Sequence, residues 1–215
     1  MVYLISQRNS KLNSRVLDRM YRMRHKVAVE HWGWRIPSAC EGVDKDEFDT
    51  LEALHFVKIA DDGCIHGCAR LLPTTLPHML SEVFPDACDR DGVPVGPDIY
   101  EFSRFFVDKT MMSRRDYIKT GYELLAAIAE WSFANGVRQL SWYSFQVTYG
   151  LALPLWTTKP LGSPKTHEGD ESVYVPAISN ITAEAVARTR SKAQVTGAAF
   201  KFVSDIDWSL SDEAA

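Results

Sequence analysis

The chain has 215 residues, of which 46% are hydrophobic and 24% are charged, and its formal net charge is −4. This composition is typical of one compact globular domain, and the net acidity argues against a general nucleic-acid-binding protein. We expect one domain over residues 1–204 and a frayed acidic tail over residues 205–215. No apolar stretch reaches the roughly 18 residues that span a bilayer, and the N-terminus does not have the pattern of a signal peptide. The sequence therefore predicts a cytoplasmic protein without membrane or nucleic-acid partners.

The N-terminal region combines a predicted strand at residues 2–6 with a predicted amphipathic helix. Apolar residues recur at spacings of three and four, as they do on the buried face of a helix. This apolar stripe consists of Leu12, Val16, Met20, Met23 and Val27. Cations follow the same spacing beside it and form a basic ridge, which consists of Lys11, Arg15, Arg19, Arg22 and Lys26. The basic ridge is either a solvated face or a surface for an acidic partner.

Residues 29–50 break the helical pattern with a long segment rich in Trp, Gly and charge. Connections of this length inside a compact domain are usually functional. Residues 54–60 and 65–72 then form a predicted β-hairpin around an Asp-Asp-Gly turn. The segment 73–86 is predicted to be a loop with one short helical turn.

The hairpin also contains potential metal ligands. Cys64, His66 and Cys68 alternate along GCIHGC, which would place them on one face of a strand. No second pair of cysteines or histidines at ligand spacing completes such a site, so we expect no metal ion. Four scattered cysteines make no disulfide framework either, which is consistent with a reducing compartment.

The second half of the chain alternates between strands and helices. We expect strands at 100–108, 137–145 and 172–176, a helix over 117–135, and a last helix from Thr182 to beyond Ala199. This order of elements predicts an α/β fold in which helices cover both faces of one mixed sheet.

The strand at residues 100–108, YEFSRFFVD, carries two opposite charges within an apolar run. Residues three apart on a regular strand point to opposite faces, so Glu101 and Arg104 would not share a site. An edge strand with one solvated face is the commoner way to accommodate such charges. A β-bulge would instead turn both side chains to one face, and bulges are frequent at active sites.

Several motifs together resemble the LuxI-type acyl-homoserine-lactone synthases, the autoinducer synthases of bacterial quorum sensing. They occur in order over residues 20–107, about half of the chain, and such a set is more specific than any single pattern. The motifs are MYRMRHKV, WGW, DKDEFD, CARLLPTTLPHMLSEVFPD and YEFSRFF. One position departs from the family pattern. The family generally has Phe four residues after the first arginine, in the segment that closes over the nucleoside, whereas this chain has Ala28 after Arg24.

The resemblance implies that residues 1–204 form a single-domain αβα sandwich around a mixed, splayed central sheet, like the GCN5-related acetyltransferases. Strands 100–108 and 137–145 would part to receive an acyl-pantetheine thioester. It also implies a two-step reaction. The amine of S-adenosylmethionine attacks the thioester, and the carboxylate then displaces methylthioadenosine to close the lactone. S-adenosylmethionine is a substrate here, so no cofactor is expected.

The resemblance also implies roles for individual residues. Glu101 is the expected general base, and Arg104 is the second catalytic residue. The expected S-adenosylmethionine-binding residues are Arg24, Trp34, Asp46, Asp49, Arg70, Phe84 and Phe105. The candidates for the acyl pocket are Met79, Ser103, Trp142 and Trp156. The charged residues could equally form a structural ion network, and Arg70 is the member best suited to that role.

The acyl donor is expected to be an acyl carrier protein or an acyl-CoA. The turn SRRDYIKTG contains arginines but not the glycine cluster that cradles the pyrophosphate of CoA, which favours a carrier protein. Aromatic residues at 142, 143 and 145 predict a narrow acyl pocket. Two other functions stay open: an N-acyltransferase of this fold that acts on another amine, and a regulatory or nucleic-acid-binding module that uses the basic ridge.

Overall fold

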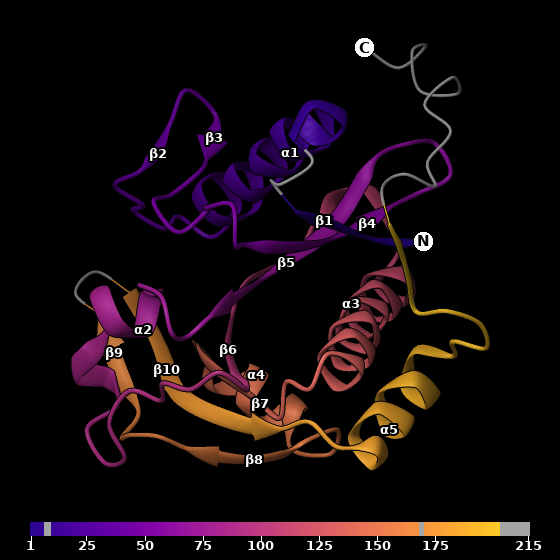
Figure 1. Cartoon of the computed structure of the whole chain (residues 1–215). Helices are drawn as coiled ribbons and strands as arrows, with labels where there is room; N and C mark the ends of the chain where they lie inside the picture. The colour runs from indigo at the N-terminus through magenta and orange to yellow at the C-terminus, as the bar shows by residue number, and fades with distance from the viewer. Residues whose placement is uncertain (7–9, 168–169, 203–215) are drawn as a thin grey trace.

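The computed structural model describes residues 1–6, 10–167 and 170–202, without the side chains of 10–13 and 111 (Figure 1). Within these ranges a nine-stranded sheet has the order β11-β1-β4-β5-β6-β7-β10-β8, and β9 pairs with β10. The strands of this sheet are β1 Val2–Ser6, β4 Leu54–Ile59, β5 Ile65–Pro73, β6 Ile99–Val107, β7 Gln139–Phe145, β8 Thr157–Pro160, β9 Lys165–His167, β10 Asp170–Asn180 and β11 Phe200–Phe202. A separate hairpin consists of β2 Ala39–Cys40 and β3 Val43–Asp44.

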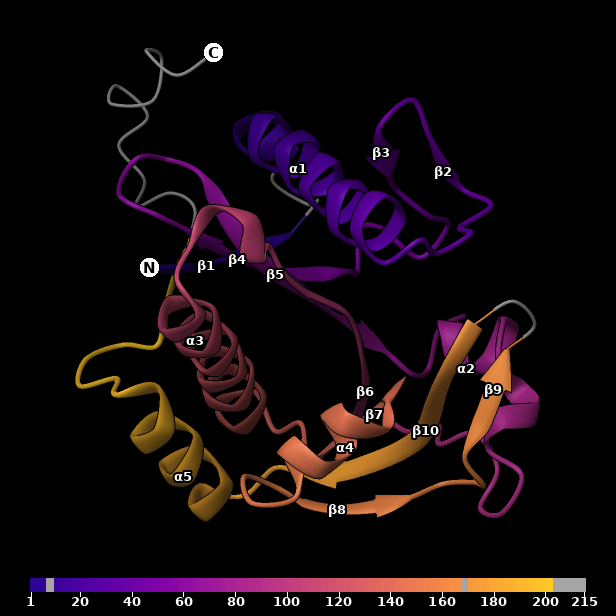
Figure 2. The same cartoon turned by 180° about the vertical axis from the view of Figure 1, so that it is seen from behind.

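Helices cover both faces of the sheet, as expected for an αβα sandwich (Figures 1 and 2). The α-helices are α1 Ser10–His25, α2 Met79–Glu82, α3 Arg114–Ala134, α4 Gln146–Ala152 and α5 Ala183–Ala193. The other helical segments are the π-helix η2 Lys26–His31 and the 3-10 helices η3 Pro85–Ala87 and η4 Lys109–Met111. None of the helices in the described part of the chain is long and apolar enough to span a bilayer.

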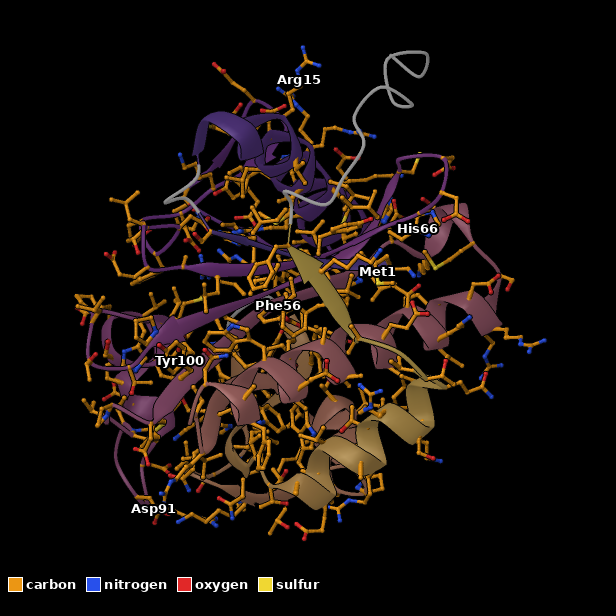
Figure 3. All side chains as sticks on the ribbon, turned by 45° about the vertical axis from the view of Figure 1, so that its right-hand side comes forward. Met1, Arg15, Phe56, His66, Asp91 and Tyr100 are labelled. Atoms are coloured by element: carbon orange, nitrogen blue, oxygen red, sulfur yellow. The ribbon has the colours of Figure 1, made fainter. Side chains whose placement is uncertain are left out.

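Two apolar layers hold this sandwich together. On one face, the predicted stripe of α1 packs against the sheet, and Val16, Met20 and Met23 are buried there. On the other face, α3 and α5 lie side by side (Figure 2). Phe56 and Tyr100, labelled in Figure 3, both contact the Trp131 ring of α3, with centroid distances of 6.2 and 5.7 Å. The periodicity of the sequence thus identified the buried side of α1.

The C-terminal region differs from the expectation. The last helix does not run beyond Ala199, because α5 ends at Ala193 and Gln194 adopts the left-handed conformation with φ 56°. The chain then returns as β11, which pairs in parallel with β1. Strands β8, β9 and β11 and helix α4 were not predicted. The expected acidic tail, 205–215, lies outside the described residues.

The pairing of β6 with its two neighbours positions the functional site. Against β5, Cys68 pairs with Phe106 and Arg70 with Ser103, so β6 has one extra residue between these pairs. Arg104 and Phe105 of β6 thus lie opposite Ala69 of β5 and form a bulge, in which Arg104 has a φ of 52°. Against β7, β6 pairs in parallel only from Ile99 to Glu101. The remainder of β7 pairs with β10 alone, so β6 and β7 diverge beyond this point, as predicted.

Candidate active site

The bulge at Arg104 brings the two charges of the YEFSRFFVD strand to one face. Glu101 contacts the first residues of α2, and Arg104 contacts the loop that contains Asp44 and Asp46. Phe105, the next residue, points to the opposite face and contacts the Phe102 ring. The bulge explanation is therefore confirmed. The edge-strand explanation is wrong, because β6 lies between β5 and β7.

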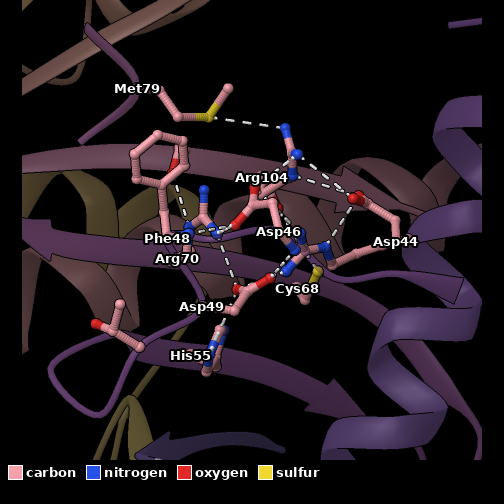
Figure 4. A network of polar contacts seen from close by, with 12 residues as sticks. Asp44, Asp46, Phe48, Asp49, His55, Cys68, Arg70, Met79 and Arg104 are labelled. Atoms are coloured by element: carbon pink, nitrogen blue, oxygen red, sulfur yellow. Dashed lines mark hydrogen bonds and ion pairs between the residues drawn. The ribbon is translucent and has the colours of Figure 1, made fainter. Parts of the chain in front are cut away.

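Three arginines and three aspartates form an ion network in which each side chain is at most 8% exposed (Figure 4). Its members are Arg24, Arg70, Arg104, Asp44, Asp46 and Asp49. Arg24 donates from Nε to Asp44 at 3.1 Å and from Nη1 to Asp49 at 2.9 Å. Helix α1 supplies Arg24 because its buried stripe faces the sheet, so the network ties this helix to the loop 44–49.

Arg70 and Arg104 attach the same loop to the central strands. Arg70 Nη1 donates to Asp46 and, at 2.8 Å, to Asp49, while its Nε donates to Ser103 Oγ at 3.2 Å. Arg104 Nη2 donates to Asp46 Oδ2 at 2.7 Å. Equal numbers of cations and anions compensate one another, which is the condition for burying such a cluster.

Burial and charge act together on the titration of this network. Burial alone would raise the pKa of Asp49, but Arg24 and Arg70 hold that pKa well below its usual range. Burial lowers the pKa of His55 from 6.5 to about 3, although Asp49 opposes the change. His55 Nε2 lies 3.8 Å from Asp49 Oδ1. Asp49 is therefore ionised at neutral pH, and the adjoining His55 imidazole is uncharged.

Glu101 occupies a separate position beside the network. Its carboxylate is 2% exposed and accepts from the backbone amides of Met79 at 3.1 Å and Leu80 at 2.7 Å, at the start of α2. Burial raises the pKa of Glu101, although these amide hydrogen bonds oppose the change. A carboxylate with a raised pKa in a buried site has the properties of a general base.

Aromatic side chains from the segment after η2 bridge the diverging strands. Trp34 lies 5.9 Å from Phe106 of β6 and 5.6 Å from Phe145 of β7, between ring centroids. Trp32 lies 5.2 and 5.6 Å from the same two rings. Ala28 is fully buried in η2, and its carbonyl accepts from the Trp34 amide at 2.9 Å. Trp32 thus supplies an aromatic ring in the segment where Ala28 has none.

Phe84 lies apart from these tryptophans, in a second aromatic group on the same face. Its ring centroid is 5.0 Å from Tyr143 and 5.5 Å from His167. Tyr174 connects this group to Phe145, with ring centroids 4.8 Å apart. The expected nucleoside-binding residues Trp34 and Phe84 are therefore linked through intervening rings.

The acyl-pocket candidates lie on both faces of the sheet. Met79 and Ser103 are on the ion-network face, where the Met79 sulfur is 3.7 Å from Arg104 Nη1. Trp142 and Trp156 are buried on the α3 face with Phe105. Their indole nitrogens are satisfied by the protein, since Trp142 donates to Ser179 and Trp156 to Thr189, each at 3.0 Å. The binding roles of all these residues stay predictions.

Asp44 is a member of the ion network that sequence reasoning missed. It is fully buried and lies between Arg24 and Arg104, with its Oδ2 3.3 Å from Arg104 Nε. The signal was present, because Asp44 opens the DKDEFD run that also supplies Asp46 and Asp49. The resemblance points only to Asp46 and Asp49, and local sequence does not indicate which acids in such a run point inwards.

The three potential metal ligands of the hairpin make no cluster with one another. Cys68 is buried, and its Sγ donates to the Arg104 carbonyl at 3.5 Å, inside the bulge. Over the part of the chain that the structure describes, no three His, Cys, Asp or Glu side chains are placed to hold a metal ion.

Solved structures with the same fold define its class. A putative N-acetyltransferase from Lactobacillus plantarum, 16% identical, has a TM-score of 0.55 over 84% of this chain and 99% of that protein. The CoA-dependent acyl-homoserine lactone synthase MesI is 30% identical, with a TM-score of 0.81 over 93% of this chain and 98% of that protein. The CoA-dependent synthase BjaI, solved with S-adenosylmethionine and isopentyl-CoA, is 28% identical. Its TM-score is 0.83 over 94% of this chain and 92% of that protein. The expected acetyltransferase-like fold is confirmed.

The sequence matches the autoinducer synthase family over residues 8–176, and this chain belongs to that family. The isovaleryl-homoserine lactone synthase of Bradyrhizobium diazoefficiens is 34% identical over 66% of this chain and 62% of that protein. An acyl-homoserine-lactone synthase of Agrobacterium fabrum is 33% identical over 58% of this chain and 60% of that protein. The matched part of the chain thus spans about three fifths of the length of these curated relatives.

Proposed function

We propose that this protein is an acyl-homoserine-lactone synthase. It transfers an acyl group from a thioester to the amine of S-adenosylmethionine, and then closes the lactone and releases methylthioadenosine. The observation that carries the proposal is the bulge at Arg104, which turns Glu101 and Arg104 towards one face where β6 and β7 part. Membership of the autoinducer synthase family supports the same reaction.

Glu101 is the proposed general base of the first step. A free α-amino group has a pKa of about 7.7–8.0, so most of it is protonated at neutral pH and must lose a proton before it attacks. A buried carboxylate with a raised pKa can take this proton directly or through one water. The amine nitrogen then bonds to the carbonyl carbon, and the carbon–sulfur bond breaks to release the thiolate.

Arg104 is the proposed partner of the substrate carboxylate. The side chains of Arg24 and Arg70 are 1% and 0% exposed and are enclosed by the aspartates, whereas that of Arg104 is 8% exposed. Arg104 is thus the most accessible cation of the ion network. A guanidinium binds a carboxylate with two parallel hydrogen bonds. Arg24 and Arg70 are assigned the structural role of holding the loop 44–49.

The second step requires less from the protein. The sulfonium is a good leaving group, and the attacking carboxylate belongs to the same molecule. Holding the substrate in a folded conformation therefore supplies much of the rate enhancement. Trp34 is proposed to contact the sulfonium or the adenine, because its indole face attracts cations and stacks on rings.

An acyl-CoA is the proposed acyl donor. MesI and BjaI, which match more than nine tenths of this chain, are both described as CoA-dependent. Helix α3 also begins close after β6 with the exposed residues Arg114 and Arg115, and the N-terminus of a helix favours phosphate. An acyl carrier protein is the second candidate donor.

The basic ridge gives little support to an acyl carrier protein as the donor, or to the alternative function of nucleic-acid binding. Three of its cations already bind groups of this protein, and the Lys11 side chain lies outside the described residues. Arg19, Arg22 and Lys26 contact the Gly63 carbonyl, Asp18 and Asp108, respectively. Cations with internal partners contribute less to the attraction of an external anion.

The test is a product analysis with purified protein. The protein is incubated with S-adenosylmethionine and a panel of acyl-CoA and acyl-carrier thioesters, and mass spectrometry detects acyl-homoserine lactone and methylthioadenosine. Both products should appear together, and neither should form when the acyl donor is left out. Their absence with every donor would overturn the proposed function. Product from carrier thioesters alone would overturn the donor assignment only.

A further inference from the structure

Ser141 of β7 is a buried hydroxyl that the mechanism above does not use. It is 0% exposed, and its Oγ has no hydrogen-bond partner within the described part of the chain. Buried polar groups in folded proteins are nearly always hydrogen-bonded, and an exception often marks a catalytic role or a bound molecule.

The position of Ser141 relates it to Glu101. The two residues pair with each other in the parallel β6–β7 ladder, and theirs is its last pair. Paired residues on neighbouring parallel strands point to the same face, and such strands lie about 4.8 Å apart. Ser141 therefore shares the α2 face with Glu101, as does Tyr143 two residues later, which packs near Leu80. The hydroxyl lies at the point from which β6 and β7 diverge.

We infer that the Ser141 hydroxyl donates a hydrogen bond to the carbonyl oxygen of the acyl thioester. This inference rests on the proposed function. When the amine nitrogen bonds to the carbonyl carbon, the π electrons move to the oxygen, and a donor aimed at this oxygen stabilises the charge. The electrons return as the carbon–sulfur bond breaks, and Ser141 keeps its proton throughout. Glu101 receives the proton of the amine.

Other polar groups beside Glu101 are less suited to this role. The amides of Met79 and Leu80 already donate to the carboxylate. His78 is also buried, and its Nε2 has no hydrogen-bond partner among the described residues. Its Nδ1 lies 2.9 Å from the Leu76 carbonyl, which fixes the proton on Nδ1 in the neutral ring. In that tautomer Nε2 is an acceptor, whereas the Ser141 hydroxyl can donate whatever the form of the imidazole.

The chain offers a matched control for this serine. Ser132 of α3 is likewise 0% exposed, and its Oγ likewise has no partner among the described residues. It lies on the helix that covers the other face of the sheet (Figure 2). Ser141→Ala and Ser132→Ala therefore remove the same kind of group, but only the first removes the proposed donor.

The experiment compares the steady-state kinetics of both variants with those of the unsubstituted protein. Ser141→Ala should lower kcat about 10²-fold, with the KM for S-adenosylmethionine within about threefold and the pH profile unchanged in shape. Ser141→Cys retains a weak donor, so its kcat should lie between those of Ser141→Ala and the unsubstituted protein. Ser132→Ala should retain the kcat of the unsubstituted protein. Thermal unfolding verifies that each variant is folded.

Two results would overturn the inference. Turnover of folded Ser141→Ala within twofold of the unsubstituted protein would exclude the donor role while leaving the proposed function intact. An equal loss in Ser132→Ala would assign the effect to packing. Absence of product from the unsubstituted protein would overturn the proposed function and this inference together, so the failures are distinguishable.

Discussion

Arg104 donates to Asp46 at 2.7 Å from a backbone position with a φ of 52°. Left-handed backbone conformations are uncommon for residues other than glycine, asparagine and aspartate, and they carry a cost that the surrounding structure must offset. The ion pairs to Asp46 and Asp44 are the charged contacts that help to offset it. The bulge and the ion network thus depend on each other, and together they orient the guanidinium.

Arg104→Lys tests whether this guanidinium binds the substrate carboxylate. Lysine keeps the charge but cannot make two parallel hydrogen bonds, so the KM for S-adenosylmethionine should rise about tenfold or more. Steady-state kinetics measures the change. Arg138→Lys is the control, because Arg138 is exposed and lies 3.9 Å from Asp98. An unchanged KM in folded Arg104→Lys would assign the carboxylate to another residue.

Asp49→Asn should strongly destabilise the protein. Asp49 is buried and accepts from both Arg24 and Arg70, so its neutralisation leaves two buried cations short of a counter-charge. Breaking such a buried pair costs about 3–5 kcal/mol of unfolding free energy, measured by urea denaturation. Asp18→Asn, in an exposed pair with Arg22, should cost no more than about 1 kcal/mol. Similar values for the two variants would contradict a structural role for the network.

His55 should make stability depend on pH below neutrality. Its pKa is about 3 in the folded protein and about 6.5 when unfolded, so the unfolded chain binds more protons between these values. Stability is therefore lost as pH falls from 6.5, by up to about 1.4 kcal/mol per pH unit. Urea denaturation from pH 7 to 4.5 should show a shallower loss in His55→Gln than in His66→Gln. Parallel curves for the two variants would exclude His55 as the cause.

Glu101→Gln should abolish most of the turnover. A general base contributes about 10²–10⁴-fold, whereas the affinity for S-adenosylmethionine should change little. Burial raises the pKa of Glu101, so kcat/KM of the unsubstituted protein should fall at low pH as this carboxylate becomes protonated. The kcat/KM of Glu101→Gln should not fall in this way at low pH. Glu82→Gln is the control, because Glu82 is an exposed residue at the end of α2, the helix that the Glu101 carboxylate contacts. Near-normal turnover of Glu101→Gln would remove the base role.

Trp142→Ala should shift donor preference towards longer acyl chains if Trp142 forms the end of the acyl pocket. Each buried methylene contributes about 0.8 kcal/mol, so room for two more should raise relative kcat/KM about tenfold for a longer donor. Competition assays with paired acyl thioesters measure the ratio. Trp131→Ala removes another indole from the same core layer and should leave the ratio unchanged. The narrow-pocket idea fails if both variants behave alike, or if the unsubstituted protein already prefers long donors.

The sequence by itself determined the fold class, the family and most of the long elements. The stripe of α1, the hairpin of β4 and β5, and the strands β6 and β7 were recognisable because their periodicity is local. The order of charged motifs from Arg24 to Arg104 likewise identified residues that the fold gathers into one network.

The tertiary structure decided which of these residues face one another. The short strands β8, β9 and β11 form only because distant strands offer them hydrogen-bond partners, and no local pattern encodes that. The bulge, which strand alternation alone could not choose over an edge strand, follows from the register of β6 against β5. The inward position of Asp44 follows from the placement of Arg24 and Arg104 by two different elements. Side-chain direction in a strand changes with a single residue of register, and register is a property of the paired strands together.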